Sequence, residues 1–371
     1  MKTITHIFKT YFPDTQGGLE EAIRQIGKYS VSKGYEVNVV SVSSNPGVRV
    51  LDGIKCISYK RNGGISTMPI SFSLWKDFKK IIERSDIIQL HFPYPFVELL
   101  TLFYKIHKPI IITYHAEIVG RNFMVKCYSP FVKQLLNKAN IIVPTSKNLA
   151  DSTPLLNDFK DKILPINLWL DKTRFLRLNE PSEDFKKKVL SFGNFALFVG
   201  VLRPYKGLGI LLDAAKKIDN NIVIVGKGPE MNFLKKRISS ENISNVFLLG
   251  YQSDENVAFL FRHCSFFVLP SCNRGECFGQ VLLEASYYHK AMISTELGTG
   301  TSFVNLDSIT GFVVPPNTVA ALSDKMNFLF NNVEICTLLG ENAYKRYSDN
   351  FTELVQGEKY IELYRKLLSN R

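Results

Sequence analysis

The chain has 371 residues, of which 45% are hydrophobic and 22% are charged, and it carries a net charge of +12. This length exceeds what one hydrophobic core usually holds, and the composition is that of a soluble globular protein, so we expect two domains rather than a repeat or low-complexity protein. The sequence shows no signal peptide, no apolar run of the ~18 residues that a membrane span needs, and no C-x-x-C pair, so we expect a cytoplasmic protein with reduced thiols and no metal site.

Apolar strands and helical stretches alternate along the first half of the chain. A strand at 5–12 leads through a glycine turn to a helix at 19–34, which Gly34 is expected to end. The remaining strands of this half are expected at 35–42, 86–92, 109–115 and 140–145. Their apolar runs are continuous, which is typical of parallel strands covered on both faces.

The same alternation restarts after a charged segment at 172–190, which we interpret as an irregular linker. Strands are expected at 195–202, 221–228, 245–250, 265–271 and 291–295. We predict two tandem α/β domains with doubly wound, Rossmann-like sheets. The predicted domains are residues 1–178 and 179–350, and an amphipathic helix at about 351–371 is expected to pack back on the first domain.

Several residues lie at strand ends, where doubly wound sheets bind their ligands. Gly17 and Gly18 open a helix, and such glycines let backbone N–H groups approach a phosphate, although a tight strand-to-helix turn alone explains them more simply. Arg203 and Lys206 follow a strand and could neutralise a diphosphate, although a solvated basic turn explains them equally well. Gly226, in the turn GKGP, lies near a ligand or is purely structural.

Two histidines also end predicted strands. His115 ends the strand at 109–115, and His91 ends the strand at 86–92 as a weaker candidate. Polar residues at such ends tend to face the ligand. A lone histidine in this position is nevertheless more often structural than catalytic.

The stretch PSCNRGECFGQVLLEA, residues 270–285, carries Glu276 and Glu284 on either side of a Phe-Gly pair. If a helix begins near Gly279, the carboxylates can bind hydroxyls while backbone N–H groups at the helix start meet a phosphate. The alternative is a loop acid and an unrelated surface acid. It is less favoured because Glu284 lies in an otherwise apolar segment.

In order along the chain, GGLEEAIRQI, VGVLRPYKGL, VGKGPE, the Glu276-x7-Glu284 pair and TGFVVPPN resemble the motifs of retaining glycosyltransferases of family four. The resemblance covers nearly the whole chain. It implies the GT-B fold, in which two Rossmann-like domains face each other across a cleft. It also implies a nucleotide-sugar donor and neither a metal nor another cofactor, in agreement with the lack of a D-x-D motif.

The resemblance also assigns roles in catalysis. Arg203 and Lys206 would bind the donor diphosphate and stabilise the leaving group. Glu276 would hold hydroxyls of the donor sugar, and His115 would support the oxocarbenium-like transition state. Many family members have an arginine where this chain has Val201, and the role is therefore given to Arg203.

The remaining donor-binding residues follow from the same resemblance. The glycines near the amino terminus would approach the diphosphate, and the second glutamate would bind the ribose. The set comprises Gly17, Gly18, Gly226, Phe278, Gly279 and Glu284.

Residues 296–317 resemble those of bacterial O-antigen mannosyltransferases, which makes GDP-mannose the expected donor. The implied product is an α-mannoside on a lipid-linked saccharide in lipopolysaccharide or other surface-polysaccharide synthesis. Two alternatives stay open. One keeps the fold and uses a UDP-sugar, and the other is a catalytically silent subunit that binds sugar nucleotides.

Residues 1–180 contain 25 of the 46 Lys and Arg and 15 of the 34 Asp and Glu, so this half carries +10 of the +12 charge. Such a half can face anionic lipid, and no motif for nucleic acid accompanies it. The basic, aromatic stretch 121–139 could lie on the inner face of the cytoplasmic membrane, or it could be an ordinary amphipathic helix. Charge reversal at Lys126, Lys133 and Lys138 is expected to weaken binding to anionic vesicles.

Overall fold

A computed structural model describes residues 1–15, 17–65, 68–117, 122–176 and 178–369. The chain forms two compact units. The first unit contains Met1–Trp169 with Glu353–Arg371, and the second contains Leu170–Thr352. The first division thus falls at Trp169, whereas the sequence predicted it at residue 178.

The first unit is built on a seven-stranded sheet in the order β3-β4-β2-β1-β7-β8-β9. All neighbouring strands are parallel except β3, which pairs antiparallel with β4. The strands of this sheet are β1 (Thr3–Ile7), β2 (Glu36–Ser43), β3 (Gly47–Leu51), β4 (Ile54–Lys60), β7 (Ile87–Phe92), β8 (Ile110–Tyr114) and β9 (Ile141–Pro144). A separate antiparallel pair is formed by β5 (Gly63–Ile65) and β6 (Met68–Ile70).

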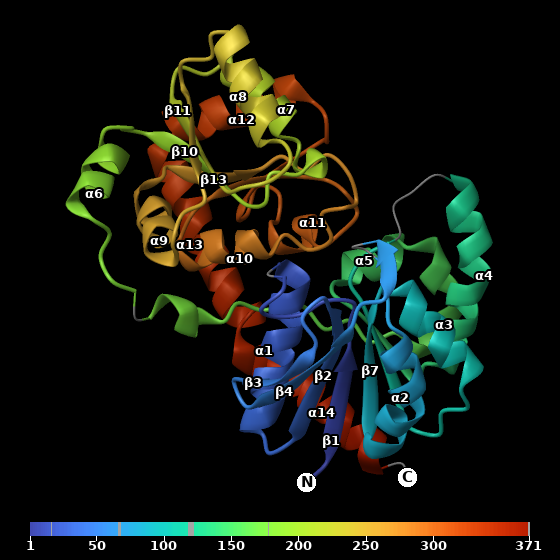
Figure 1. Cartoon of the computed structure of the whole chain (residues 1–371). Helices are drawn as coiled ribbons and strands as arrows, with labels where there is room; N and C mark the ends of the chain where they lie inside the picture. The colour runs from blue at the N-terminus through green and yellow to red at the C-terminus, as the bar shows by residue number, and fades with distance from the viewer. Residues whose placement is uncertain (16, 66–67, 118–121, 177, 370–371) are drawn as a thin grey trace. The chain divides into compact units, whose positions relative to one another are not determined.

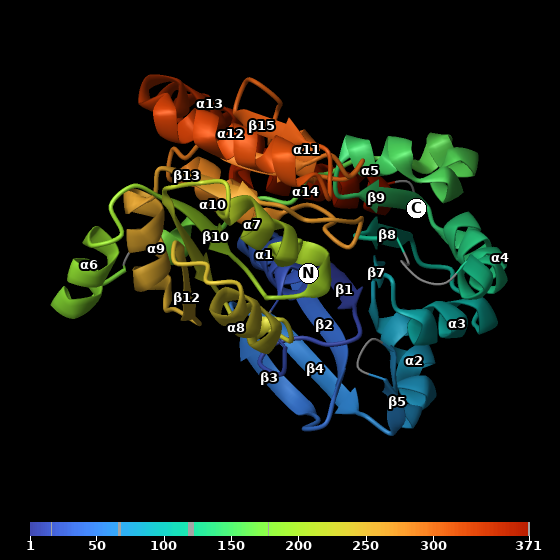
Figure 2. The same cartoon turned by 90° about the horizontal axis from the view of Figure 1, so that it is seen from above.

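The helices of this unit lie on both faces of the sheet (Figures 1 and 2). They are α1 (Gly18–Ser32), α2 (Phe72–Arg84), α3 (Pro95–Phe103), α4 (Asn122–Lys138), α5 (Lys147–Ser152), the 3-10 helix η1 (Pro154–Lys162) and α14 (Glu353–Ser369). The first predicted helix is therefore confirmed as α1. Gly34, with φ of 85°, comes one residue after its C-cap.

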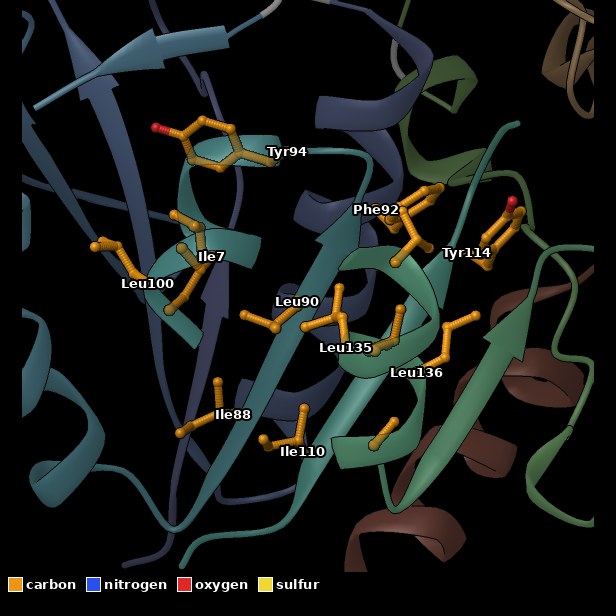
Figure 3. Close-up of a cluster of buried hydrophobic side chains, with 14 of the residues drawn as sticks. Ile7, Ile88, Leu90, Phe92, Tyr94, Leu100, Ile110, Tyr114, Leu135 and Leu136 are labelled. Atoms are coloured by element: carbon orange, nitrogen blue, oxygen red, sulfur yellow. The ribbon is translucent and has the colours of Figure 1, made fainter. Parts of the chain in front are cut away.

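One face of the sheet is filled by aliphatic and aromatic side chains. Ile7 of β1 lies beside Ile88 and Leu90 of β7, and Leu135 and Leu136 of α4 close over them (Figure 3). All five side chains are at most 3% exposed. This packing explains why these strands show continuous apolar runs in the sequence.

The opposite face is covered by α1 and α14. Tyr360 and Tyr364 of α14 pack in one cluster with Ile4 and Ile87 of the sheet. The hydroxyl of Tyr29 in α1 donates to the carboxylate of Glu358 in α14 at 2.6 Å. The last helix of the chain is thus part of the first unit, although it is separated from the rest of that unit by the whole second unit.

The edge strand β3, its neighbour β4 and the β5–β6 pair were not predicted. The residues of β3 are exposed, apart from the half-buried Leu51. The segment therefore lacks the apolar run by which the other strands were found. The first strand also ends at Ile7 instead of residue 12, since a turn follows in which Asp14 N donates to Tyr11 O at 3.1 Å.

Glu98 in α3 is a buried acid that makes the stability of the first unit pH-dependent. Its Oε1 accepts from the backbone N–H of Tyr94, and Oε2 has no hydrogen-bond partner among the described residues. Burial raises the pKa of Glu98 to about 8, and the bond from Tyr94 offsets this rise only in part. The folded protein therefore retains a proton on Glu98 at pH values where the unfolded chain has released it.

The free energy of unfolding is consequently expected to fall as the pH rises from about 4.5 to about 8, by roughly 1.4 kcal/mol for each unit of raised pKa. Denaturant unfolding at pH 5, 6.5 and 8 measures this slope. Glu98→Gln keeps the shape of the side chain and should remove the contribution. An equal slope in the variant would show that Glu98 is not its source.

The second unit has a six-stranded, wholly parallel sheet in the order β12-β11-β10-β13-β14-β15. Its strands are β10 (Phe195–Val199), β11 (Asn221–Val225), β12 (Val246–Gly250), β13 (Phe266–Leu269), β14 (Met292–Thr295) and β15 (Gly311–Val314). Figure 1 shows α7, α8 and α12 on one face and α9 and α10 on the other. The helices are α6 (Glu183–Leu190), α7 (Leu208–Ala215), α8 (Met231–Ser240), α9 (Asp254–His263), α10 (Gln280–Tyr287), α11 (Thr301–Val304), α12 (Val319–Asn331) and α13 (Val333–Asn350), with 3-10 turns η2 (Lys172–Phe175) and η3 (Pro204–Lys206).

Both sheets have the doubly wound strand order. Counted within each unit, the parallel strands run 3-2-1-4-5-6, with β3 added at one edge of the first sheet. The expectation of two Rossmann-like sheets is confirmed. In this order the switch point, where ligands bind beyond the carboxyl ends of the strands, lies between β1 and β7 and between β10 and β13.

The prediction of an irregular linker at 172–190 was wrong for part of that segment. Residues Glu183–Leu190 form α6, whose N-cap Ser182 accepts from Phe185 N at 3.3 Å. Two acidic residues in its first turn favour the same helix start. The charged composition that suggested a linker belongs to a short, partly exposed helix that packs on α9.

Candidate functional site

The switch point of the second unit is formed by the loops that follow β10 and β13. These two loops touch closely, because Gly207 has φ of 68° and a Cβ at this position would lie 2.0 Å from the carbonyl oxygen of Pro270. The backbone N–H of Cys272 donates to the carbonyl of Tyr205 at 2.8 Å. The two loops therefore act as one structural element, and they carry five of the predicted site residues.

Lys206 and Glu276 form a buried ion pair between these loops. The Lys206 ammonium contacts Oε2 of Glu276, and Ser271 Oγ donates to the same oxygen at 3.0 Å. Burial alone would lower the pKa of Lys206, but the Glu276 carboxylate raises it above its usual value. Lys206 is therefore a fixed positive charge at the carboxyl end of β10.

Arg203 differs from Lys206 in its surroundings. It is exposed, and it stands directly before the 3-10 turn η3. Within the described residues, its guanidinium makes no hydrogen bond or ion pair. The structure thus places one buried and one exposed cation after β10, and only the buried cation is held by the protein.

The Phe-Gly turn after Glu276 is held in place by the segment that follows β14. Thr299 Oγ1 donates to the carbonyl of Glu276 at 2.8 Å, and Gly300 N donates to the carbonyl of Cys277 at the same distance. Phe278 is buried, and Gly279 has φ of 76°, which disfavours other residues there. Helix α10 begins at Gln280, so the predicted helix start near Gly279 is confirmed.

Glu284 lies just over one turn into α10 and is partly buried. Its Oε1 is 3.4 Å from Nη1 of Arg174, and Arg174 is also paired with Asp254 through Nε and Oδ2 at 2.6 Å. Sequence reasoning did not find Arg174, which lies in η2 within the presumed linker. The only signal for it was the charge of that segment.

Gly226 follows β11, and its position is explained by packing. It has φ of 140°, and a Cβ there would lie 1.8 Å from the carbonyl oxygen of Gly200. Gly228 similarly packs against the backbone of Leu202. The GKGP turn thus lets the chain after β11 lie against the loop that carries Arg203 and Lys206.

Gly226→Ala is therefore expected to destabilise the second unit by more than about 2 kcal/mol, even without a ligand, because it adds both strain and a clash. Denaturant unfolding measures the change. Gly209→Ala is the matched control, since its Cβ would make only ordinary contacts of 3.6 Å and 3.8 Å. Equal stability of the two variants would refute this explanation of Gly226.

In the first unit, Gly17 and Gly18 are exposed at the start of α1. Gly17 is the N-cap, and its backbone is extended, which any residue can adopt. An added Cβ would lie 2.9 Å from Oε2 of Glu20, a buried side chain whose Oε1 accepts from Thr10 and Thr15 at 3.1 Å and 2.7 Å. Packing against Glu20 therefore explains Gly17, and its role toward a ligand stays a prediction.

His115 is fully buried directly after β8. Its Nε2 lies 2.9 Å from Nδ1 of His91, and Nε2 of His91 lies 3.0 Å from Nδ1 of His6 in β1. Sequence reasoning treated His115 and His91 as separate candidates and did not consider His6.

The stretch 121–139 falls partly outside the described residues, which exclude Arg121 and the side chain of Lys126. Lys133 pairs with Asp158 at 2.7 Å. Lys138 donates to the carbonyls of Thr101 and Leu102 at 2.8 Å and 2.9 Å. Lys138 thus serves the structure of the unit, whereas the Lys133–Asp158 pair is exposed. Charge reversal at Lys138 would therefore disturb packing as well as any lipid contact.

Among the described residues, no three His, Cys, Asp or Glu side chains are grouped so that they could bind a metal ion. In the same part of the chain, no helix is both long and apolar enough to cross a bilayer. That the reaction needs no metal remains a prediction.

Two tandem doubly wound sheets are the architecture of GT-B glycosyltransferases. The family profile described as "Glycosyl transferases group 1" matches residues 180–346, and "Glycosyltransferase Family 4" matches residues 16–166. The O-antigen chain mannosyltransferase C of Escherichia coli is 36% identical over 99% of both chains. The chain belongs to the family of group 1 and family 4 glycosyltransferases with the GT-B fold.

Two further comparisons support this assignment. The D-rhamnosyltransferase WbpZ of Pseudomonas aeruginosa is 35% identical over 94% of this chain and 92% of its own length. The structure of sucrose-phosphate synthase from Thermosynechococcus elongatus superposes with a TM-score of 0.81 over all of both chains, at 19% identity. At that identity the likeness concerns the fold alone.

Proposed function

We propose that the protein transfers mannose from GDP-mannose to a lipid-linked saccharide, with retention of anomeric configuration, during synthesis of O-antigen or a related surface polysaccharide. The full-length similarity to an O-antigen chain mannosyltransferase supports this choice of sugar. The observation that carries the proposal is the buried Lys206–Glu276 pair at the switch point of the second unit.

This pair can bind the two chemically different parts of a sugar nucleotide. Lys206 and Ser271 both contact Oε2 of the Glu276 carboxylate, so Oε1 is left for a hydroxyl of the donor sugar. Lys206 and Arg203 would face the diphosphate, whose charge increases as the bond to the sugar breaks. A carboxylate neutralised by an ammonium is a poor nucleophile, so Glu276 positions the sugar and does not form a covalent intermediate.

The reaction then differs from glycoside hydrolysis by two carboxylates. The acceptor hydroxyl would attack from the face that the diphosphate leaves, and the leaving phosphate would take its proton. Glu284, near the start of α10, would bind the ribose hydroxyls. Gly17, Gly18 and His115 would contribute from the first unit, through the start of α1 and the end of β8.

D-rhamnose is a second candidate sugar, because WbpZ is nearly as similar to this chain as the E. coli protein. D-rhamnose is mannose without the 6-hydroxyl group. A site that hydrogen-bonds this hydroxyl would reject the deoxy sugar strongly, whereas an apolar site would accept both. The choice therefore depends on a single oxygen atom of the donor.

Calorimetric titration of the purified protein with GDP-mannose, GDP-D-rhamnose and UDP-glucose, without added metal, tests the donor. We expect GDP-mannose to bind most tightly. Tighter binding of GDP-D-rhamnose or UDP-glucose would overturn the assigned donor while keeping the site. If the folded protein bound none of them, a silent subunit that acts with a partner enzyme would become the better hypothesis.

Contact with an anionic membrane is also a proposal. The excess charge of residues 1–180 supports it, and so does a lipid-linked acceptor. Co-sedimentation with vesicles containing anionic lipid, at low and high salt, tests it. Equal sedimentation with neutral and anionic vesicles would contradict it.

A further inference from the structure

Three buried histidines form a continuous hydrogen-bonded chain across the first sheet. His6 in β1, His91 in β7 and His115 after β8 are each at most 1% exposed. Their nitrogen atoms are joined at 3.0 Å and 2.9 Å, and the rings are stacked with centroids 5.2 Å apart in both pairs. This chain of histidines crosses β1, β7 and β8, which are neighbouring strands at the switch point of this unit.

These histidines occupy a costly position. Neighbouring residues of the same strands, such as Ile7 and Leu90, point to the opposite face and fill its apolar core (Figure 3). On the histidine face, both polar atoms of the Gln89 side chain have a partner, since it accepts from Tyr364 at 2.6 Å and donates to Thr113 at 2.7 Å. Burying three imidazoles without a role would cost stability that an apolar residue would not.

All three rings are neutral. Burial lowers the pKa of His6 and of His115 to about 3, and it lowers the pKa of His91 well below its usual value. The nearby Lys9 ammonium disfavours a charge on His115, and His6 and His115 disfavour one on His91. Each ring therefore carries one N–H and one lone pair.

Two bonds between three neutral rings allow only two arrangements of the protons. In one, every ring carries its proton on Nδ1, so that His6 donates to His91 and His91 donates to His115. In the other, every ring carries its proton on Nε2, and the bonds run in the opposite direction. The ring atoms left over are Nε2 of His6 and Nδ1 of His115, which have no partner among the described residues.

The two arrangements differ in where an N–H is left without an acceptor. With protons on Nδ1, the spare N–H is on His115, at the strand end where a ligand binds, and only a lone pair is left on His6. With protons on Nε2, the spare N–H is on His6, within β1. In either arrangement one buried N–H lacks a partner among the described residues. Only the N–H of His115 lies at a strand end, where a bound ligand could accept it, so the arrangement with protons on Nδ1 is the one that a ligand would satisfy.

We infer that His6 and His91 are positioning residues, which hold His115 as a neutral ring with its proton on Nδ1, so that it offers one hydrogen-bond donor to an oxygen of the substrate. That this oxygen belongs to the donor sugar rests on the proposed function. The three histidines do not conduct protons through the protein, because no described residue could take up a proton released at Nε2 of His6. Their hydrogen bonds orient His115 instead.

Nitrogen NMR of the full-length protein with 15N-labelled histidine tests the proton arrangement without reference to activity. The chain has six histidines, which keeps the spectrum assignable through single His→Asn variants. We expect three histidines with a protonated Nδ1 and an unprotonated Nε2, unchanged between pH 5 and pH 8. Protons on Nε2, or a His115 that titrates in this range, would overturn the inference.

Kinetics of two His91 variants test the positioning role. In His91→Phe both hydrogen bonds are lost, and kcat is expected to fall about 10- to 100-fold while KM for the donor changes little, because the cations of the second unit are intact. His91→Asn keeps a donor near the position of Nδ1, so it should restore much of kcat. Equal kcat in both variants would show that the three hydrogen-bonded histidines serve only packing.

The exposed His107→Asn is the matched control and should leave kcat unchanged. If His91→Phe does not fold, the NMR result for the wild-type protein still decides the inference. If no donor binds to wild-type protein, the proposed function fails, whereas the proton arrangement is confirmed or refuted independently.

Discussion

Replacing Lys206 with methionine is expected to lower the free energy of unfolding by about 3–5 kcal/mol, because the Glu276 carboxylate would stay buried without its counter-charge. Both side chains are no more than 10% exposed, so water cannot easily replace the missing partner. Among the described residues, Ser271 would be left as the donor to the Glu276 carboxylate. Denaturant unfolding of the ligand-free protein measures the loss.

The double variant Lys206→Met/Glu276→Gln separates stability from function. With both charges removed, the unfolding free energy is expected to return to within about 2 kcal/mol of wild type. Sugar transfer should stay abolished, because the diphosphate and the sugar have each lost a binding group. Recovery of both stability and transfer would show that the pair is only structural.

The same pairing changes how Glu276 itself must be tested. Glu276→Ala would leave the Lys206 ammonium unpaired and would open a cavity, so that lost activity could result from unfolding. Glu276→Gln retains the size of the side chain and one oxygen for Ser271 or a sugar hydroxyl. It is therefore the more informative single variant.

Arg203→Ala is expected to reduce sugar transfer by about 100- to 1,000-fold, since it removes a cation from the developing charge of the leaving diphosphate. Because Arg203 is exposed and makes no ion pair within the described residues, the unfolding free energy should change by less than about 0.5 kcal/mol. Lys236→Ala, at an exposed lysine of α8, is the matched control for loss of one positive charge.

A steady-state transfer assay together with denaturant unfolding decides the role of Arg203. Full activity in Arg203→Ala would remove it from the site and leave Lys206 as the only predicted cation there. A large loss of stability would instead reveal a structural role for its side chain.

The alternation of strands and helices was predictable because parallel strands covered on both faces have long apolar runs. The runs ending near Phe92 and Leu269 are of this kind, and both strands lie at a switch point. The exposed β3 and the capped helix α6 carry no such run, and the sequence therefore did not reveal them. β3 is held by its pairing with β4, and the start of α6 is set by its N-cap Ser182.

The candidate site, like the fold, could be predicted from the sequence only in part. The helix start assumed near Gly279 is confirmed, and Glu276 and Glu284 lie on either side of it because both belong to one short segment. Pairing of Lys206 with Glu276 joins positions 70 residues apart, and no local pattern indicates which acid a lysine will meet.

His6 shows most clearly what could not be predicted from the sequence alone. In the sequence it is one of several polar residues in the predicted strand at 5–12, where a satisfied core histidine is the ordinary expectation. Only the parallel register of β1, β7 and β8 brings it into line with His91 and His115. The chemical interest of the residue arises from neighbours that are 85 and 109 positions away.

Calorimetric titration of GDP-mannose into wild-type protein and into the folded Lys206→Met/Glu276→Gln variant, without metal, tests the central claim most directly. We predict that the wild-type protein binds the sugar nucleotide and that the double variant, with its fold intact by circular dichroism, does not. Equal binding by both proteins, or no binding by folded wild-type protein, would contradict the assignment of the Lys206–Glu276 pair as the donor site.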